Sequence, residues 1–225
     1  MIMMTQTIKH HLTDNIVTAY AAGSLPEAFN LLVATHVSMC DECRATVAAH
    51  EAVGGVVLED VREIDLGVDA LEACFAMIET GPKDPIKLRA QPTKPNSESR
   101  LFPTPLHDYV GGDLDAVKWR KVGGGVKQAI LPTSKDASVR LLYIPAGCEV
   151  PDHGHNGTEM TLVLQGAFRD EFARFGTGDV EICDAQLEHK PIAEEGEDCI
   201  CLAATDAPLK FSGFLPKLAQ PFLRI

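Results

Sequence analysis

The sequence is short of basic side chains. Its 225 residues include 20 Lys and Arg against 32 Asp and Glu, so the formal net charge at pH 7 is −12. Nucleic acids and anionic membranes both attract proteins through clusters of positive charge. A chain this acidic is therefore not expected to bind DNA, RNA or an anionic membrane directly.

Long apolar runs are lacking as well. No stretch approaches the roughly 20 apolar residues of a transmembrane helix, and residues 1–11 lack the apolar run of a secretory signal. The seven cysteines are an odd number, and without a secretory signal we expect them in the reducing cytoplasm. Clustered cysteines in that compartment favour metal or redox chemistry over structural disulfides.

Charge and proline content predict two folded units. Residues 1–85 carry 4 basic and 13 acidic side chains, and residues 106–225 carry 12 and 18. Between them, residues 86–105 carry 4 basic and 1 acidic side chain, four prolines and few large apolar groups. Because proline fixes φ and this composition offers little to a core, the segment is predicted to be an exposed linker.

The two units are predicted to differ in secondary structure. Capping patterns, helical spacing and terminal glycines predict helices at residues 14–23, 27–36, 43–53 and 66–80. On the last of these, Leu71, Cys74, Phe75 and Ile78 form an apolar stripe expected to face a core. The second unit has short β-rich runs at residues 139–144, 160–164, 180–183, 199–203 and 209–214. That pattern indicates an antiparallel sandwich or barrel, so the predicted fold class is α + β in two domains.

A first metal constellation lies in the helical unit. His36 and Cys40 are one helical turn apart, and Cys43 follows three residues later. Two thiols and an imidazole suit Zn²⁺, and a structural zinc site needs a fourth ligand. His11 is the best donor for that position, and His10 is the alternative.

A second constellation lies in the β-rich unit. His153 and His155 alternate onto one face of an extended segment, Glu159 follows a glycine turn, and His189 comes from a separate strand. Three imidazoles and one carboxylate suit Zn, Mn, Fe, Ni or Cu. In the same unit, Cys199 and Cys201 alternate onto one face of a strand, as a redox pair or as packed core residues.

These residues carry a resemblance to known families. The spacing Gly147-x5-His153-x-His155-x3-Glu159-x6-Gly166 resembles the first cupin motif. The second cupin motif is only partly matched, because Asp184-Ala185-Gln186 replaces its Pro-x-Gly while His189 keeps its place. HxxxCxxC with an early histidine resembles the zinc-binding anti-sigma domain. With residues 119–132 and 162–170, nearly the whole chain resembles ChrR-type anti-sigma factors with a C-terminal cupin domain, apart from the linker and the residues around Asp60.

The resemblance implies sites, cofactors and a partner. It implies Zn²⁺ on His11, His36, Cys40 and Cys43, and Zn²⁺ or another divalent transition metal on His153, His155, Glu159 and His189. It also implies that the helical domain inhibits a group IV (ECF) sigma factor, which the cupin domain releases in response to singlet oxygen or other oxidative stress. Such a protein is cytoplasmic and has no catalytic residues. A homodimer through the cupin faces is a further expectation.

Two other functions remain open at this point. The second constellation can leave an open coordination position, as in a metal-dependent cupin enzyme, for example a dioxygenase or an isomerase. Nothing in the sequence identifies a general base or a substrate clamp for such an enzyme. The cupin domain can also act as an oxidant or ligand sensor without turnover, and this reading is compatible with an anti-sigma factor.

Overall fold

The computed structural model describes residues 7–81, 100–151, 153–154, 156–208 and 210–211. By its internal contacts the chain divides into a large unit of residues 1–54 and 100–225 and a small unit of residues 55–99. The division predicted from the sequence was different, with boundaries at 1–85, 86–105 and 106–225. The first helices belong with the β-rich region because their apolar faces are buried against it, as described below.

The helical prediction for the N-terminal region is confirmed, with changes at the helix ends. The helices are α1 (Asp14–Ala21), α2 (Glu27–Met39), α3 (Asp41–Glu59), α4 (Ala70–Thr80) and α5 (Thr104–Val110), with a short 3-10 turn η1 (Leu114–Ala116). Helix α3 does not stop at Gly54-Gly55 as predicted. A side chain at either glycine would meet nothing within 4 Å, and each glycine costs an exposed helix only about 1 kcal/mol relative to alanine.

The end of the predicted linker is part of the compact unit. Phe102 is buried in the core, and α5 begins two residues after it. Pro105 lies in the first turn of that helix, where its missing N–H costs no hydrogen bond. The prolines that suggested an extended linker therefore begin a helix at this end, and residues 86–99 lie outside the described part of the chain.

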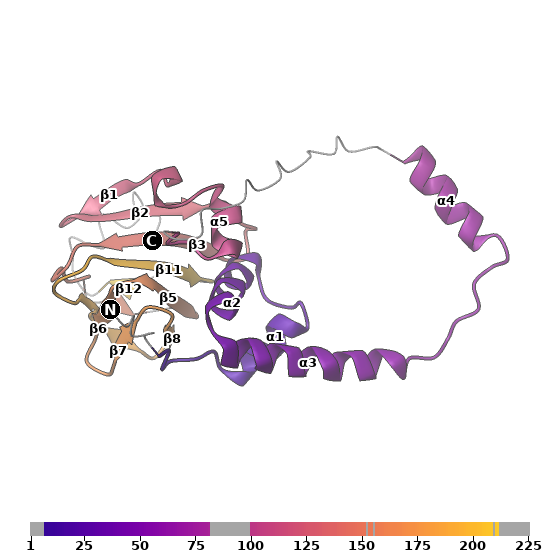
Figure 1. Ribbon diagram of the computed structural model, residues 1–225, viewed down its shortest axis with the longest axis horizontal. Coiled ribbons are helices and arrows are strands. Elements are labelled where there is room, and N and C mark those ends of the chain that lie inside the picture. Colours follow the sequence, from indigo (N-terminus) through magenta and orange to yellow (C-terminus); the bar gives the residue numbers. More distant parts are fainter. Residues whose placement is uncertain (1–6, 82–99, 152, 155, 209, 212–225) are drawn as a thin grey trace. The chain divides into compact units, whose positions relative to one another are not determined.

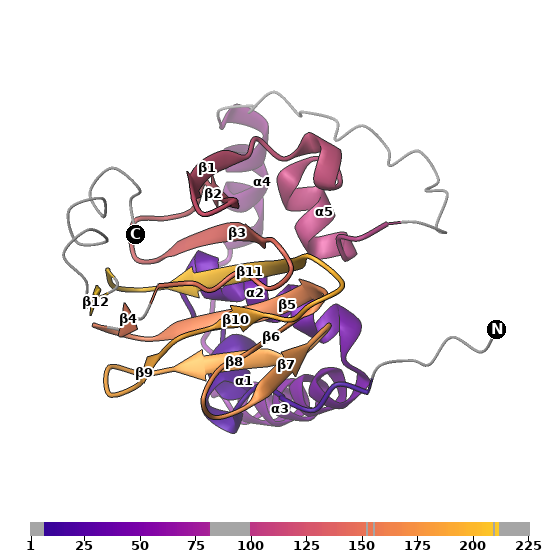
Figure 2. The ribbon, with the colours of Figure 1, turned by 90° about the vertical axis from the view of Figure 1, so that its left-hand side faces the viewer.

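The β-rich region is antiparallel, as predicted. Its large sheet has the order β1-β2-β3-β11-β5-β8, and two three-stranded sheets have the orders β10-β6-β7 and β12-β4-β9 (Figure 2). The strands are β1 (Arg120–Gly123), β2 (Val126–Leu131), β3 (Ser138–Ile144), β4 (His153–Gly154), β5 (Glu159–Gln165), β6 (Ala167–Arg169), β7 (Arg174–Gly176), β8 (Val180–Cys183), β9 (Glu188–His189), β10 (Ile192–Ala193), β11 (Cys199–Thr205) and β12 (Lys210–Phe211). The predicted strand at 209–214 is described only at β12.

Both faces of the large sheet are covered. Strand β11 is buried along its whole length. Its Ile200 and Leu202 belong to one core cluster with residues of α2 and α5 such as Leu32 and Leu106, and Cys199 and Cys201 belong to a second cluster inside the barrel.

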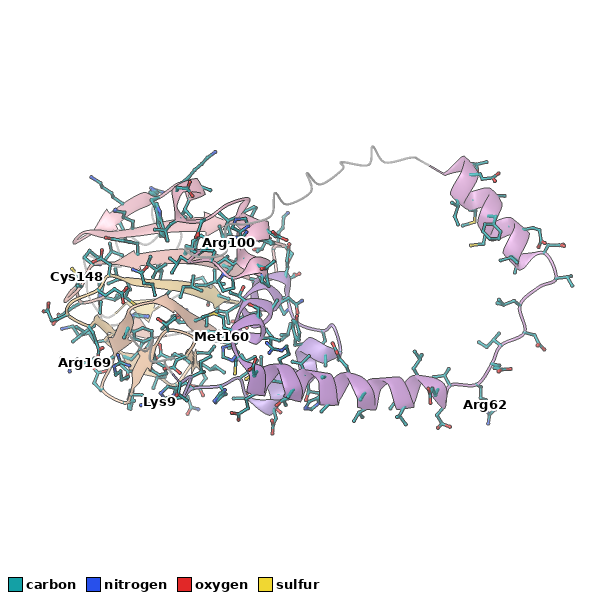
Figure 3. All side chains as sticks on the ribbon, in the orientation of Figure 1. Lys9, Arg62, Arg100, Cys148, Met160 and Arg169 are labelled. Carbon is teal, nitrogen blue, oxygen red and sulfur yellow. The ribbon has the colours of Figure 1, made fainter. Side chains whose placement is uncertain are left out.

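Helices α2 and α5 lie beside the large sheet in Figure 1, and Met160 of β5 is labelled on that side in Figure 3. Burying a side chain such as Leu32 contributes roughly 1.5–3 kcal/mol. This burial explains why α2 belongs to the same unit as the sheet.

The small unit, taken by itself, leaves its apolar side chains exposed. Leu71, Phe75 and Ile78 of α4 are 63%, 57% and 67% exposed, and Cys74 is exposed as well. The prediction that this stripe, with Cys74, faces a core is wrong. Helical spacing identifies the apolar face of a helix but not the surface that covers it. Within the described residues, no helix combines the length and apolarity that a membrane crossing requires.

Candidate metal centres

The first predicted constellation is brought together in space. Ligand atoms of His11, His36, Cys40 and Cys43 all lie within 4.8 Å of one another. His36 lies in the last turn of α2, Cys43 in the first turn of α3, and Cys40 in the single-residue break between the helices. We call these four residues the N-terminal cluster; that they bind a metal stays a prediction.

His10, the alternative fourth ligand, lies outside this group. Its ring is 4.5 Å from the ring of Phe175, measured between centroids. His11 instead places its Nδ1 3.3 Å from Sγ of Cys40 and 3.6 Å from Sγ of Cys43. Nε2 of His11 is 3.5 Å from a carboxylate oxygen of Glu42. The arrangement therefore favours His11.

One donor atom of the N-terminal cluster is suited to bind a cation. Nδ1 of His36 lies 2.9 Å from the carbonyl oxygen of Gly178. Because a carbonyl only accepts, the ring proton is on Nδ1 and Nε2 carries a lone pair. That Nε2 is buried and has no hydrogen-bond partner in the described structure. A buried lone pair beside two thiols fits a tetrahedral Zn²⁺ with two histidine and two cysteine ligands.

Burial controls the protonation of this cluster without a metal. It lowers the pKa of His36 to about 4 and raises the pKa of the Cys43 thiol to about 11. At neutral pH the imidazole is therefore neutral and the thiol keeps its proton. A bound cation would instead favour the deprotonated Cys43 thiolate, because a sulfur that coordinates a metal loses its proton.

The second constellation is brought together at three of its four residues. Ligand atoms of His153, Glu159 and His189 lie within 4.8 Å of one another, and His155 lies outside the described residues. His153 and His189 are paired across β4 and β9, with 3.3 Å between their Nε2 atoms. Burial raises the pKa of Glu159 to about 7, against the opposing influence of His189 and Arg140. We call His153, Glu159 and His189 the cupin cluster.

Two buried carboxyl groups lie next to Nδ1 of His189. Oε1 of Glu181 is 3.1 Å and Oδ2 of Asp170 is 3.4 Å from its Nδ1. Metal-binding histidines commonly give their second ring nitrogen to such a carboxylate, which fixes the ring and its tautomer. Neither carboxyl group was predicted from the sequence. The available signal was an acidic residue inside the buried run Val180-Glu181-Ile182-Cys183.

The remaining candidate residues lie inside the barrel. Sγ atoms of Cys199 and Cys201 are 3.5 Å apart, and both residues are buried. The hydrogen bond between Cys201 and Cys199, together with burial, raises the pKa of Cys201. Both thiols are therefore packed as core residues, and a redox role for the pair stays a prediction.

The comparisons with known proteins cover both regions of the chain. Residues 108–208 match a family model described as the ChrR Cupin-like domain. The chain is 57% identical over 219 residues to the Anti-sigma-E factor ChrR of Cereibacter sphaeroides, spanning 97% of this chain and 100% of that protein. It also resembles the crystal structure of Rhodobacter sphaeroides SigE in complex with the anti-sigma ChrR. That match has a TM-score of 0.75 and 55% identity, and it covers 89% of this chain and 100% of that one.

Proposed function

The chain belongs to the ChrR family of anti-sigma factors, and we propose that it binds a group IV (ECF) sigma factor in the cytoplasm and keeps it from RNA polymerase. The observation that carries the proposal is identity of 57% along the full length of a relative named as an anti-sigma factor. A relative has been crystallised with SigE. This role is regulatory rather than enzymatic, so we propose no catalytic turnover at the cupin cluster.

The surface we assign to the sigma factor is the apolar side of residues 55–81. Large side chains from Val56 to Ile78 are exposed there, and Val68 and Ile64 are 98% and 83% exposed. Exposed apolar groups in such number are characteristic of a protein interface. The same segment carries seven acidic side chains and one basic side chain, Arg62, and it complements the basic surfaces with which sigma factors bind DNA.

We propose Zn²⁺ as the resident metal of the N-terminal cluster. Its ligands come from three segments: the segment before α1, the end of α2 with the break that follows it, and the start of α3. A metal bound to all three would hold the start of α3 to the end of α2 and to the segment before α1. Because the chain continues from α3 into the exposed apolar segment, we expect loss of the metal to abolish sigma binding.

We propose that the cupin domain senses singlet oxygen or a related oxidant and brings about release of the sigma factor. His153, His155, Glu159 and His189 would hold Zn²⁺ or another divalent transition metal. When bound, such a metal would supply a centre that responds to oxidation or exchanges a ligand. The chain's own contribution is to orient His189 through Glu181 and Asp170 and to exclude water from the barrel.

The test is co-purification of the full chain with the sigma factor encoded beside its gene, followed by metal analysis. We expect a one-to-one complex that contains zinc and does not bind core RNA polymerase. Absence of a complex in zinc-containing medium would refute the anti-sigma proposal. A complex without zinc would refute the metal assignment and leave the partner assignment intact.

A further inference from the structure

The N-terminal cluster has a partner from the distant β-rich region. His36 donates its Nδ1 proton to the carbonyl of Gly178 at 2.9 Å, across 142 residues of sequence. Gly178 lies in the turn between β7 and β8. A carbonyl in this position does for a ligand histidine what Glu181 does for His189: it fixes the tautomer and aims the other nitrogen.

The same turn also holds the segment that carries His11. Oδ1 of Asp179 accepts hydrogen bonds from the backbone N–H groups of Lys9 at 2.6 Å and His10 at 2.9 Å. Oδ2 accepts the N–H of Gly176 at 2.8 Å. Val180 donates its N–H to the carbonyl of His10 at 3.1 Å. Lys9 is labelled beside the β-rich region in Figure 3. Two of the four ligands are thus positioned by one turn of the other region.

The contact between this turn and the N-terminal segment is tight. Gly178 has a φ of +92°, and a Cβ at this position would lie 2.7 Å from side-chain carbons of Ile8. Only glycine adopts such a conformation without strain. A small displacement of the turn therefore moves the segment before His11 instead of being absorbed by a gap.

The turn continues directly into the support of the cupin cluster. Strand β8 begins at Val180, and the next residue, Glu181, lies 3.1 Å from Nδ1 of His189. Asp179 and Glu181 are both buried, at 4% and 5% exposure. Residues 178–181 therefore supply supporting groups to both clusters within a single stretch, and β8 continues to Cys183, which pairs with Glu159 of β5.

We propose that Gly178 and Asp179 are positioning residues of the N-terminal metal centre. We also propose that residues 178–181, which we call the joint, couple the two clusters, so that the N-terminal cluster retains its metal more tightly when the cupin cluster is occupied. The inference rests on the proposed function, because it requires a metal at the N-terminal cluster. A change in how His189 holds Glu181 shifts β8, and the shift reaches the Gly178 carbonyl and the Asp179 carboxylate. The coupling is reciprocal, as binding at two linked sites must be.

Cobalt provides a probe of the N-terminal cluster, whose ligand atoms include two thiols. Co²⁺ bound by cysteine thiolates shows a sulfur-to-metal charge-transfer absorption that histidine and carboxylate ligands do not produce. The full chain is loaded with Co²⁺, and the decay of this absorption is followed after adding a chelator. Cys40→Ser must abolish the signal. If the wild-type chain shows no such absorption, the proposed N-terminal metal site is refuted, which distinguishes its failure from failure of the joint.

The first comparison is between Asp179→Ala and a matched control, Asp113→Ala. Asp113 also accepts three backbone hydrogen bonds, from Leu101, Phe102 and Leu114, but it contacts neither cluster. We expect Asp179→Ala to lose cobalt about tenfold faster than wild type, the lower end of the effect of outer-shell partners, and Asp113→Ala to stay within about twofold. Equal rates for Asp179→Ala and wild type, or equal acceleration in both variants, would overturn the proposal.

If Asp179→Ala does not fold, Asp179→Asn takes its place. The amide keeps an acceptor for Lys9 and His10 and loses the one for Gly176, so we expect a smaller acceleration of about threefold. A rate equal to that of wild type in this variant contradicts a positioning role for Asp179.

The second comparison tests whether the joint couples the N-terminal cluster to the cupin cluster. His153→Ala removes one of its residues, and we expect cobalt release from the N-terminal cluster to rise about threefold. When His153→Ala is combined with Asp179→Ala, or with Asp179→Asn, we expect no further increase in the rate of cobalt release. An unchanged rate in His153→Ala, or an effect that persists without Asp179, would show that the joint does not connect the two centres.

Discussion

Helices α2 and α4 have comparable apolar stripes but opposite surroundings. In α2, Phe29, Leu32 and Val33 are buried, and the helix packs against α5 and the large sheet. In α4, Leu71, Phe75 and Ile78 remain exposed. The apolar face of α2 is therefore covered within the chain, whereas that of α4 stays exposed, as the proposed sigma-binding surface requires.

The largest effect on sigma binding is expected from a substitution at Cys40, in the break between α2 and α3. Cys40→Ser removes a proposed metal ligand between α2 and α3, so we expect loss of one metal equivalent and of detectable sigma binding. The large sheet should persist, because α2 is held to it by apolar burial. Metal analysis, sigma co-purification and circular dichroism measure these three properties.

The control for this substitution is Cys148→Ser. Cys148 is a half-buried thiol that belongs to neither cluster, so metal content and binding should be those of wild type. Normal sigma inhibition by Cys40→Ser would refute the role of the N-terminal cluster.

The next largest effect is on the free energy of unfolding, and it distinguishes α2 from α4. Leu32→Ala empties a fully buried site in α2 and should lower the free energy of unfolding by about 2–5 kcal/mol. Leu71→Ala on α4 should change it by no more than about 0.5 kcal/mol, since exposed positions contribute little. Urea denaturation of the two variants measures the difference, and similar losses in both would remove the contrast between the helices.

A smaller effect is expected on binding at α4. Phe75→Asp should weaken sigma binding by at least about 2 kcal/mol, or roughly 30-fold in Kd, because buried aromatic anchors dominate interfaces. Phe172→Asp is the matched control, since Phe172 is 67% exposed in the β-rich region. Calorimetric titration of each variant with the sigma factor gives both affinities. Equal affinities for the two would move the interface away from α4.

The smallest effect on the complex is expected at the cupin cluster. His153→Ala and Glu159→Ala should leave sigma affinity within about twofold of wild type but reduce release after exposure to singlet oxygen. A reporter gene transcribed by the sigma factor measures basal and oxidant-induced activity in one culture. High basal transcription in either variant would contradict this division of roles between the regions.

Much of the two clusters could be predicted from the sequence. Ligand chemistry restricts residue types, and spacing along one element restricts geometry, as for His36 and Cys40 on successive turns. The antiparallel β-rich region also followed from its short alternating runs. The family resemblance joined these parts, and the relative that covers 97% of the chain confirms it.

Other features depend on contacts that local patterns do not encode. Asp179 binds backbone groups about 170 residues away, and Gly178 offers only a carbonyl, so neither has a recognisable motif. Glu181 supports His189 although their strands are not neighbours, since β8 pairs with β5 and β9 pairs with β4. The exposure of Phe75 was mispredicted because periodicity describes one helix and not its neighbours.

Hydrogen–deuterium exchange of the free chain and of its sigma complex tests the central claim most directly. If α4 presents a surface for another protein, its amides should exchange rapidly in the free chain and become strongly protected in the complex. The amides of β11, already buried, should change little. A stable complex in which α4 exchanges as fast as in the free chain would contradict the account.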